Sequence, residues 1–258
     1  MILATWNVNG IRARSQRLAE WLEERQPDVV CLQELKIVED DFPHLEIRAS
    51  GYRAVLAGQQ SWNGVAVLAK DQPEIVVKEL SGAADAGARF IVAKVSGLEV
   101  ASIYVPNGKT LAHADYPLKL KWLESLANYL ESRADKGAPL VLGGDFNVCS
   151  TELDSFGGAR LDGTIFHTLE ERALIARIRA AGLVDLFRAK YPEAPGYSWW
   201  DYRAGSFHKN EGLRIDLLFA TPDVAARVKD VTVDRDYRKK GKSGAVPSDH
   251  APVVAILD

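Results

Sequence analysis

The sequence predicts an α/β fold in which two β-sheets pack face to face and helices cover their outer surfaces. Strand-like segments rich in Val, Ile, Leu and aromatic residues outnumber helical segments by ten to three. A strand-rich chain with few amphipathic helices buries its apolar faces best in such layers. Polar motifs run from residue 7 to residue 250 with no Pro/Ser/Gly-rich linker between them, which indicates one domain over residues 1–258.

Each predicted strand is a short apolar run bounded by turn or polar residues. Several runs contain little polar alternation, which is typical of strands buried on both faces. The predicted strands are 2–8, 28–33, 52–57, 64–69, 90–95, 98–105, 139–144, 214–220, 228–234 and 251–257.

Three helices are predicted from apolar residues at helical spacing. The first begins after Ser15, and the second covers about 117–134. The third starts at a capping box formed by Thr168 and Glu171 and ends at Gly182. We expect the apolar stripes of these helices to face the core.

The composition of the chain indicates a globular protein and argues against a membrane protein. With 258 residues, 47% hydrophobic and 26% charged, the chain is typical of a soluble globular protein. No segment has the features of a signal peptide or the roughly 18 apolar residues of a membrane span, so we expect a cytoplasmic protein with no membrane partner. Cys31 and Cys149 form no CxxC motif, which argues against a disulfide framework or a zinc site.

The net charge of −3 argues against binding nucleic acid through overall basicity. Local basic clusters remain. Each cluster alone is explained by a solvated surface, whereas their common position in loops beside the polar motifs favours contact with a phosphate backbone. The clusters are Arg12, Arg14 and Arg17; Lys119 and Lys121; and Arg235, Arg238, Lys239, Lys240 and Lys242.

Polar side chains follow several of the predicted strands. A carboxylate at the end of a buried strand is costly unless it is paired or holds a metal ion. Several such ends meeting at one place therefore predict a metal-assisted site. The residues are Asn7, Glu34, Asp145, Asn147, Asp216, Asp249 and His250, in the motifs WNVNG, LQELK, GGDFN, GLRID and PSDHAP.

Those motifs, together with YVPNG at 104–108 and the segment from YSWWDYR to GLRID, resemble the exonuclease III family of apurinic/apyrimidinic endonucleases. That family belongs to the endonuclease/exonuclease/phosphatase superfamily. The resemblance extends over the whole chain and implies a four-layered α/β sandwich with two packed, mainly antiparallel or mixed sheets flanked by helices. It implies a DNA-repair nuclease more than a lipid or inositol phosphatase.

Phosphodiester hydrolysis requires a neutralised phosphate, an aligned water and a stabilised leaving oxygen. A hard divalent cation held by few carboxylates supplies much of this, so we expect Mg²⁺, with Mn²⁺ as an alternative. Glu34 is the best candidate ligand, and the resemblance supports it. Asn7 and Asp249 are the further candidates.

Asp145 and Asn147 are two residues apart on an extended segment, so their side chains can point to the same side. Asp145 is then placed to orient or deprotonate the attacking water, and Asn147 to donate to a phosphate oxygen. The alternative is that GDFN is only a turn after a strand. The other motifs favour the catalytic interpretation.

His250 needs a partner that fixes its tautomer, and Asp216 is the obvious one if the two strands adjoin. A protonated His250 could hold the phosphate, and a neutral one could accept the proton of the water. The sequence leaves both roles open. The resemblance places the hydroxyl of Tyr104 at the phosphate or the leaving group, whereas a half-buried structural tyrosine is the alternative.

Substrate choice is expected to come from loops. The resemblance assigns Trp199, Leu213 and Ile215 to an apolar pocket for a flipped-out sugar that lacks its base, although ordinary core packing is an alternative for the tryptophan. Arg12 and Lys109 are the expected contacts to the duplex backbone. A lysine at position 109 suits phosphate but leaves insertion into the helix doubtful.

Phe166 and His167, in LDGTIFH at 161–167, are bulky residues in a loop that by resemblance borders the same pocket.

From the full set of polar motifs and the resemblance, we expect cleavage 5′ to abasic sites in duplex DNA, with 3′→5′ exonuclease and 3′-phosphatase activity at one centre. We expect the protein to act as a monomer. If either bulky residue fills the pocket, the exonuclease would dominate and abasic-site incision would be weak. A phosphatase of small-molecule or inositol phosphates is the other alternative.

Overall fold

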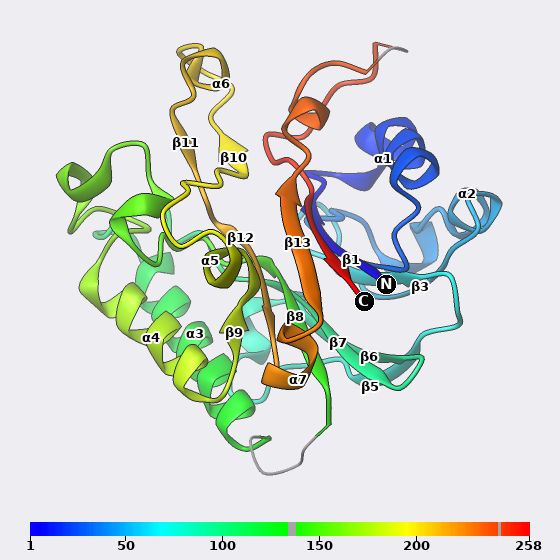
Figure 1. Cartoon of the computed structure of the whole chain (residues 1–258), viewed down its shortest axis with the longest axis horizontal. Coiled ribbons are helices and arrows are strands. Elements are labelled where there is room, and N and C mark those ends of the chain that lie inside the picture. Colours follow the sequence, from blue (N-terminus) through cyan, green and yellow to red (C-terminus); the bar gives the residue numbers. More distant parts are fainter. Residues whose placement is uncertain (134–137, 242–243) are drawn as a thin grey trace.

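The chain forms two six-stranded sheets that pack face to face. This computed structural model describes residues 1–133, 138–241 and 244–258, and Figure 1 shows the arrangement of its layers. Across the first sheet the strands are β13 (Val228–Val233), β14 (Val253–Leu257), β1 (Ile2–Asn7), β2 (Val29–Gln33), β4 (Val65–Ala69) and β3 (Arg53–Ala57). Across the second they are β5 (Glu74–Val77), β6 (Phe90–Val95), β7 (Leu98–Tyr104), β8 (Leu140–Asp145), β12 (Asp216–Ala220) and β9 (Val184–Asp185).

Both sheets are mixed. The pairs β1–β2 and β7–β8 are parallel, and the other pairs in the two sheets are antiparallel. A separate small hairpin pairs β10 (Trp199–Trp200) with β11 (Gly212–Leu213). The structure thus confirms the predicted sandwich of two mixed sheets.

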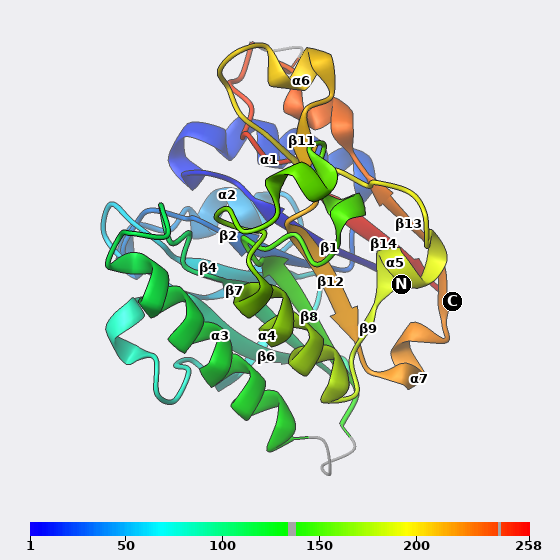
Figure 2. The same ribbon diagram turned by 90° about the vertical axis from the view of Figure 1, so that its left-hand side faces the viewer.

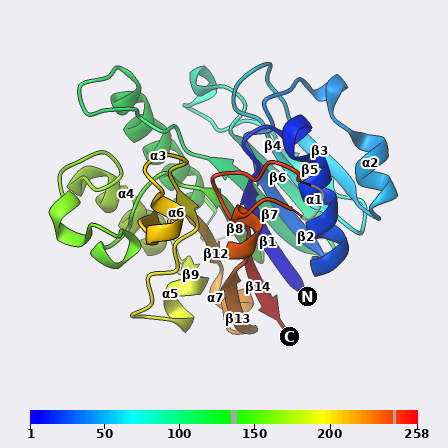
Figure 3. The ribbon, with the colours of Figure 1, turned by 90° about the horizontal axis from the view of Figure 1, so that it is seen from above.

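Helices cover the outer face of each sheet, as the views in Figures 2 and 3 show. α1 (Ile11–Arg25) and α2 (His44–Ala49) lie over the first sheet, and α3 (Asp115–Glu131) and α4 (Leu169–Ala180) lie over the second. Within the residues that the structure describes, the shorter α-helices are α5 (Leu186–Lys190), α6 (Ser206–Lys209) and α7 (Pro222–Ala225). None of the described helices has the length and apolar composition that crossing a membrane requires.

Three apolar clusters hold these four layers together. Val67 of the first sheet and Ile91 and Leu218 of the second belong to the cluster between the sheets. Outside the first sheet, Trp21 of α1 packs edge-on against Trp6 of β1, with 5.5 Å between ring centroids. Because each large apolar side chain contributes about 1.5–3 kcal/mol when buried, these clusters supply the main stabilisation of the layers.

Most predicted elements are present, with small shifts at their ends. The capping box of Thr168 and Glu171 is formed at the start of α4, as predicted. The predicted start of the first helix after Ser15 was wrong, because α1 begins at Ile11. The N–H of Ile11 donates to the carbonyl of Leu35 at 3.1 Å, so a tertiary contact anchors this end.

The elements that the sequence analysis missed are short or lie at an edge. β5 is an edge strand that exposes Ile75 and Val76, so its sequence lacks a clear buried face. The strands β9, β10 and β11 have two residues each. Such short segments carry too little periodicity for a sequence-based prediction.

Strand register brings the polar motifs to one end of the sandwich. In the second sheet, Asp145 at the end of β8 lies opposite both Tyr104 and Asp216. In the first sheet, Asn7 at the end of β1 lies opposite Gln33, the residue before Glu34. The parallel pairs β1–β2 and β7–β8 end at the same end of the sandwich. Side chains from distant parts of the chain therefore lie in one cluster there.

Candidate active site

His250 and Asp216 form a buried pair at the centre of this cluster. Nδ1 of His250 lies 2.8 Å from Oδ2 of Asp216, and the hydroxyl of Ser198 donates to the same oxygen at 2.6 Å. Nε2 of His250 lies 3.8 Å from Oδ2 of Asp145. The predicted partnership of His250 with Asp216 is therefore present as a contact, and the imidazole lies between two carboxylates.

These acids determine the charge of the histidine. Burial alone disfavours the imidazolium, but the carboxylates of Asp216 and Asp145 outweigh it and raise the pKa of His250 to about 10. Burial, reinforced by the negative charges of Asp216 and Glu34, raises the pKa of Asp145 to about 7. At neutral pH the imidazole of His250 is therefore cationic, and the neighbouring carboxyl group of Asp145 can gain or lose a proton.

Asn7 joins the carboxylates that come from the two sheets. Its Nδ2 donates to Oε1 of Glu34 at 2.8 Å and to Oδ2 of Asp145 at 2.9 Å. Its Oδ1 accepts from the N–H of Asn9 at 3.0 Å. In this arrangement Asn7 holds two acids together with its amide nitrogen, while its role as a metal ligand stays a prediction.

Glu34 lies on a strained backbone. Its φ is +53°, in the left-handed region that costs a residue other than glycine about 1 kcal/mol or more. Nζ of Lys36 lies 2.8 Å from Oε2 of Glu34. Burial opposes ionisation of Glu34, but the charge of Lys36 and the hydrogen bond from Asn7 keep its pKa below the usual value. Glu34 is thus an ionised carboxylate at neutral pH.

Asp249 belongs to an adjoining network. Its two oxygens accept from Nδ2 of Asn9 at 2.8 Å and from Nε1 of Trp199 at 3.0 Å. Burial acts against its charge, but His250 and these donors lower its pKa. The carboxylate of Asp249 thus fixes the side chains of Asn9 and Trp199 beside the cluster, and its role as a ligand stays a prediction.

Asn147 is next to the cluster on a residue with φ of +50°. Its N–H donates to Oδ1 of Asp145 at 2.9 Å, and its Nδ2 donates to the carbonyl of Val105 at 3.0 Å. The first contact orients the carboxylate of Asp145. Donation from Asn147 to a phosphate stays a prediction.

Tyr104 is 9% exposed at the end of β7. Burial and the charges of Glu34 and Asp145 raise its pKa well above the usual value, so the phenol stays protonated and can donate a hydrogen bond. The guanidinium of Arg89 lies 4.4 Å from the centre of its ring. A protonated hydroxyl close to the acids suits the predicted role of Tyr104.

The predicted apolar pocket residues also come together. Trp199 lies opposite Leu213 in the β10–β11 hairpin, and both pack with Ile215 and Cys149. Phe166 packs against the same cluster. Of the two bulky residues in that loop, Phe166 is therefore the one beside these pocket residues.

His167 has a different environment. It is buried, and its Nδ1 lies 2.8 Å from the carbonyl oxygen of Ile165. Burial lowers the pKa of its imidazole. His167 thus packs into its own loop.

The two predicted cations at the DNA surface are exposed and paired with nearby acids. Arg12 lies 2.8 Å from Asp41, and Lys109 lies 2.9 Å from Asp115. Exposed pairs of this kind contribute little stability and exchange readily for other anions. Contact of Arg12 and Lys109 with DNA stays a prediction.

Several residues that organise the cluster were missed by sequence reasoning. Asn9 and Lys36 stand in the quoted motifs WNVNG and LQELK, and Ser198 precedes Trp199, so proximity to a motif was the available signal. Arg89 has no such signal, because its position beside Tyr104 depends on the pairing of β6 with β7.

The donor set fits a hard divalent cation. Ligand atoms of Glu34, Asp145 and His250 lie within 4.8 Å of one another. In this group the hard oxygen donors are the carboxylates of Glu34 and Asp145. Two oxygen ligands are what Mg²⁺ commonly takes from a protein that binds it together with a phosphate.

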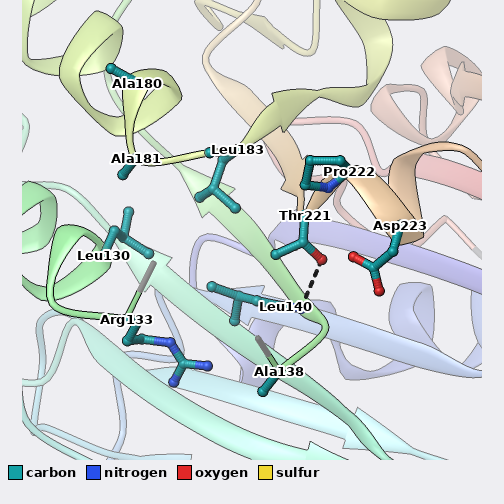
Figure 4. Close-up of a pocket in the computed structure, with 11 residues that line it drawn as sticks. Leu130, Arg133, Ala138, Leu140, Ala180, Ala181, Leu183, Thr221, Pro222 and Asp223 are labelled. Atoms are coloured by element: carbon teal, nitrogen blue, oxygen red, sulfur yellow. Dashed lines mark hydrogen bonds between the residues drawn. The ribbon is translucent and has the colours of Figure 1, made fainter. Parts of the chain in front are cut away.

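A pocket shown in Figure 4 lies away from this cluster. It has a volume of about 370 Å³ and lies between the ends of α3 and α4 and the start of β8, where Leu130, Leu183 and Pro222 line it. Leu140 lines the pocket at the first residue of β8, whereas Asp145 ends that strand. The pocket is thus at the opposite end of the sheet from the acids.

Comparison with known proteins places this geometry among nucleases. Residues 4–250 match the Endonuclease/Exonuclease/phosphatase family. The Exodeoxyribonuclease III of Haemophilus influenzae is 36% identical over 268 residues, which cover 99% of each chain. The structure of the 3′ phosphatase NExo from Neisseria bound to product DNA hairpin has a TM-score of 0.95 at 34% identity and covers 100% of this chain and 99% of that one. An AP endonuclease from Archaeoglobus fulgidus has a TM-score of 0.94 at 35% identity, again over 100% and 99%.

Proposed function

The chain belongs to the endonuclease/exonuclease/phosphatase family, and we propose that it is a divalent-metal-dependent phosphodiesterase of DNA repair. Its proposed reactions are incision 5′ to abasic sites in duplex DNA, 3′→5′ exonuclease action and removal of 3′-phosphates at one centre. The observation that carries the proposal is the buried cluster in which Glu34, Asp145 and the His250–Asp216 pair meet. Relatives named Exodeoxyribonuclease III and AP endonuclease support it.

The charges divide the chemical roles. Asp145, with a pKa near neutrality, orients the attacking water and takes its proton. His250 carries a positive charge and is held by Asp216, so it neutralises charge on the phosphate. This arrangement favours Asp145 over His250 as the base. Tyr104 donates to the phosphate or the leaving oxygen, and Asn147 adds a donor to the phosphate.

Glu34 would hold the metal ion, and Asn7 and Asp249 are proposed as its further ligands. Mg²⁺, or Mn²⁺ in its place, would offset phosphate charge and stabilise the leaving oxygen when bound. The strained backbone of Glu34 presents its carboxylate toward Asp145 and is consistent with a functional constraint on this residue.

The substrate is proposed to lie over the apolar cluster. Trp199, Leu213 and Ile215 would form one wall of the sugar pocket, and Arg12 and Lys109 would contact the duplex backbone. A single domain of residues 1–258 would both bind the DNA and cleave it, and the protein would act as a monomer. The cytoplasmic location expected from the sequence stays a prediction.

Phe166 favours a second candidate, an enzyme that acts chiefly on 3′ ends. Its side chain packs against the cluster of Cys149, Leu213 and Ile215, and Nζ of Lys119 lies 4.7 Å from the centre of its ring. Its φ of +72° is strained for an aromatic residue, which indicates that tertiary contacts hold it there. A ring in this position reduces the room for an abasic sugar but leaves the phosphate site untouched.

The proposal is tested with duplexes that carry either an abasic site or a 3′-phosphate, with Mg²⁺ and with EDTA. We expect cleavage only with Mg²⁺. Activity that is unaffected by EDTA would reject the metal mechanism. Turnover of a soluble phosphate ester, with no binding to duplex DNA at low salt, would favour a small-molecule or inositol phosphatase.

A matched pair of variants separates the two nuclease candidates. Phe166→Gly removes the ring and suits the positive φ, whereas Leu169→Ala truncates an exposed apolar residue nearby. If the ring restricts the pocket, Phe166→Gly should raise abasic-site incision about tenfold or more relative to 3′-phosphatase activity. Leu169→Ala should leave the ratio unchanged. Equal ratios in both variants and wild type would remove Phe166 as the determinant.

A further inference from the structure

Two segments near the active site enclose a second pocket. One is the connection between β10 and β11, residues 201–211, which contains α6. The other is formed by the 3₁₀ turn Arg235–Arg238 with Lys239 and Lys240, and by Val246 and Pro247. Both stand at the top of the molecule in Figure 1. The hydroxyl of Tyr202 donates to the carbonyl of Pro247 at 2.8 Å and ties them together. The pocket between them has a volume of about 390 Å³.

This pocket adjoins the proposed active site. The N–H of Trp200 donates to the carbonyl of Asp249 at 3.1 Å, and Nε1 of Trp199 donates to the carboxylate of the same residue. Tyr202 follows Trp200 by two residues, and Pro247 precedes Asp249 by two residues. Both walls of the pocket are therefore joined through the chain to residues of the proposed active site.

Arg238 is a buried cation with an unused hydrogen-bond donor in this wall. It is 8% exposed, and its guanidinium stacks on Tyr202 with 4.4 Å to the ring centre. Its Nη2 donates to the carbonyl of Trp200 at 3.3 Å, and its Nε has no acceptor. Within residues 1–133, 138–241 and 244–258, no carboxylate lies at ion-pair distance from it. A buried guanidinium of this kind is suited to bind an anion.

The neighbouring charges add to this preference. Lys240 lines the pocket and has no ion-pair partner in the described part of the chain, whereas Lys239 pairs with Asp236 at 2.6 Å. The acid in the wall, Asp201, is already engaged by Arg203 through contacts of 2.8 and 3.0 Å. The pocket therefore has an excess of positive charge in a protein whose net charge is −3.

We propose that this pocket is a subsite for a backbone phosphate of the DNA substrate, away from the phosphate that is cleaved. Arg238 donates from its planar guanidinium, and Lys240 adds a mobile charge at the rim. The proposal rests on the proposed DNA substrate and adds a determinant of affinity that is separate from the catalytic cluster. It also assigns a role to Arg238 and Lys240 of the basic cluster noted in the sequence, whereas Lys242 lies outside the described residues.

The salt dependence of DNA binding tests this subsite. Fluorescence anisotropy with an undamaged duplex in EDTA measures Kd without cleavage, for wild type and for Lys240→Ala and Arg238→Met. Lys229→Ala is the matched control, because Lys229 is an exposed lysine paired with Asp258 at the opposite end of β13. In the plot of log Kd against log salt, each pocket variant should lower the slope by about one unit. The control should keep the wild-type slope.

The outcomes separate the subsite from the proposed function. If wild type does not bind duplex DNA at low salt, the DNA-repair function fails and this inference fails with it. If wild type binds and Lys240→Ala keeps its slope, only the subsite is overturned. Because Lys240 is exposed, that variant is expected to fold, and circular dichroism checks the fold of Arg238→Met.

Inorganic phosphate distinguishes a DNA phosphate from a free anion. The thermal midpoint of wild type, measured with increasing phosphate and no DNA, should rise no more than that of Lys240→Ala. A larger rise in wild type, together with an unchanged DNA salt slope, would assign the pocket to a free anion and overturn the proposal.

Discussion

Two clusters of buried acids in this molecule have different charge balances. In the first, the Arg214 cluster, Nε of Arg214 lies 2.6 Å from Asp154, and its other nitrogens lie 2.8 and 3.1 Å from Asp185. Arg188 lies 2.6 Å from the same oxygen of Asp154. Two guanidinium groups therefore neutralise two carboxylates.

In the second, the active-site cluster, acids outnumber cations. Its carboxylates are Glu34, Asp145, Asp216 and Asp249, and its cations are Lys36, Arg89 and His250. Neutral donors such as Asn7 and Ser198 satisfy part of the excess. A buried excess of negative charge opposes folding and favours binding of a cation, whereas a balanced cluster contributes to the fold alone. The count of cations thus separates a functional cluster from a structural one.

The largest expected effect is the loss of activity in Asp145→Asn. Removing the proposed base should lower kcat by about 10²–10⁴-fold. The free energy of unfolding should stay within about 1 kcal/mol of wild type, because the substitution removes one charge from an acid-rich cluster. Steady-state kinetics on a 3′-phosphate duplex and urea unfolding measure the two quantities. A large loss of stability would show that Asp145 belongs with the structural acids.

For Arg214→Met we expect mainly a loss of stability, in contrast to the loss of activity expected for Asp145→Asn. This change leaves Asp154 and Asp185 buried with too little positive charge, so the free energy of unfolding should fall by about 3–5 kcal/mol. Chemical denaturation measures it, and Arg203→Met, at an exposed arginine paired with Asp201, is the control. If Arg214→Met and the control unfold at the same urea concentration, the cluster has no structural role.

A smaller effect is expected for Glu34→Gln. The Mg²⁺ concentration for half-maximal activity should rise at least about tenfold, because the amide is a weaker ligand than the carboxylate. Titration of activity with Mg²⁺ measures this. Glu39→Gln is the control, since Glu39 is a partly exposed acid that pairs with Lys78. An unchanged Mg²⁺ requirement in Glu34→Gln would remove Glu34 from the proposed metal site.

The smallest expected effect is the decrease, at acid pH, in the stability that Asp154 of the Arg214 cluster contributes. Burial opposes the charge of Asp154, but Arg214 and Arg188 lower its folded-state pKa below the usual value of 3.8. Its stabilising contribution is therefore complete above pH values near 3.8 and is lost as the pH falls through the lower folded pKa. The difference in unfolding free energy between wild type and Asp154→Asn should shrink between pH 6 and pH 3. A difference independent of pH would contradict this assignment.

Much of the fold could be predicted because its signals are local. Apolar runs identified the long strands, and the capping box identified α4. The start of α1 and the edge strand β5 could not be found in this way, since tertiary contacts and partner strands define them. The motifs likewise identified the polar residues of the site but not Arg89, which reaches Tyr104 only through strand pairing.

By itself, the sequence determined which strands end in acids and that a metal-dependent phosphodiesterase was the best interpretation of them. It assigned a catalytic role to Asp145 from the motif GGDFN and gave no role to Asp154, which stands in none of the motifs, so the charge balance around the two acids stayed undetermined. Tertiary structure decided this by placing Arg214 and Arg188 beside Asp154, while Asp145 received Glu34, Asp216 and His250 as neighbours. Coulomb interactions depend on distance through space, and only the packing of the two sheets sets those distances.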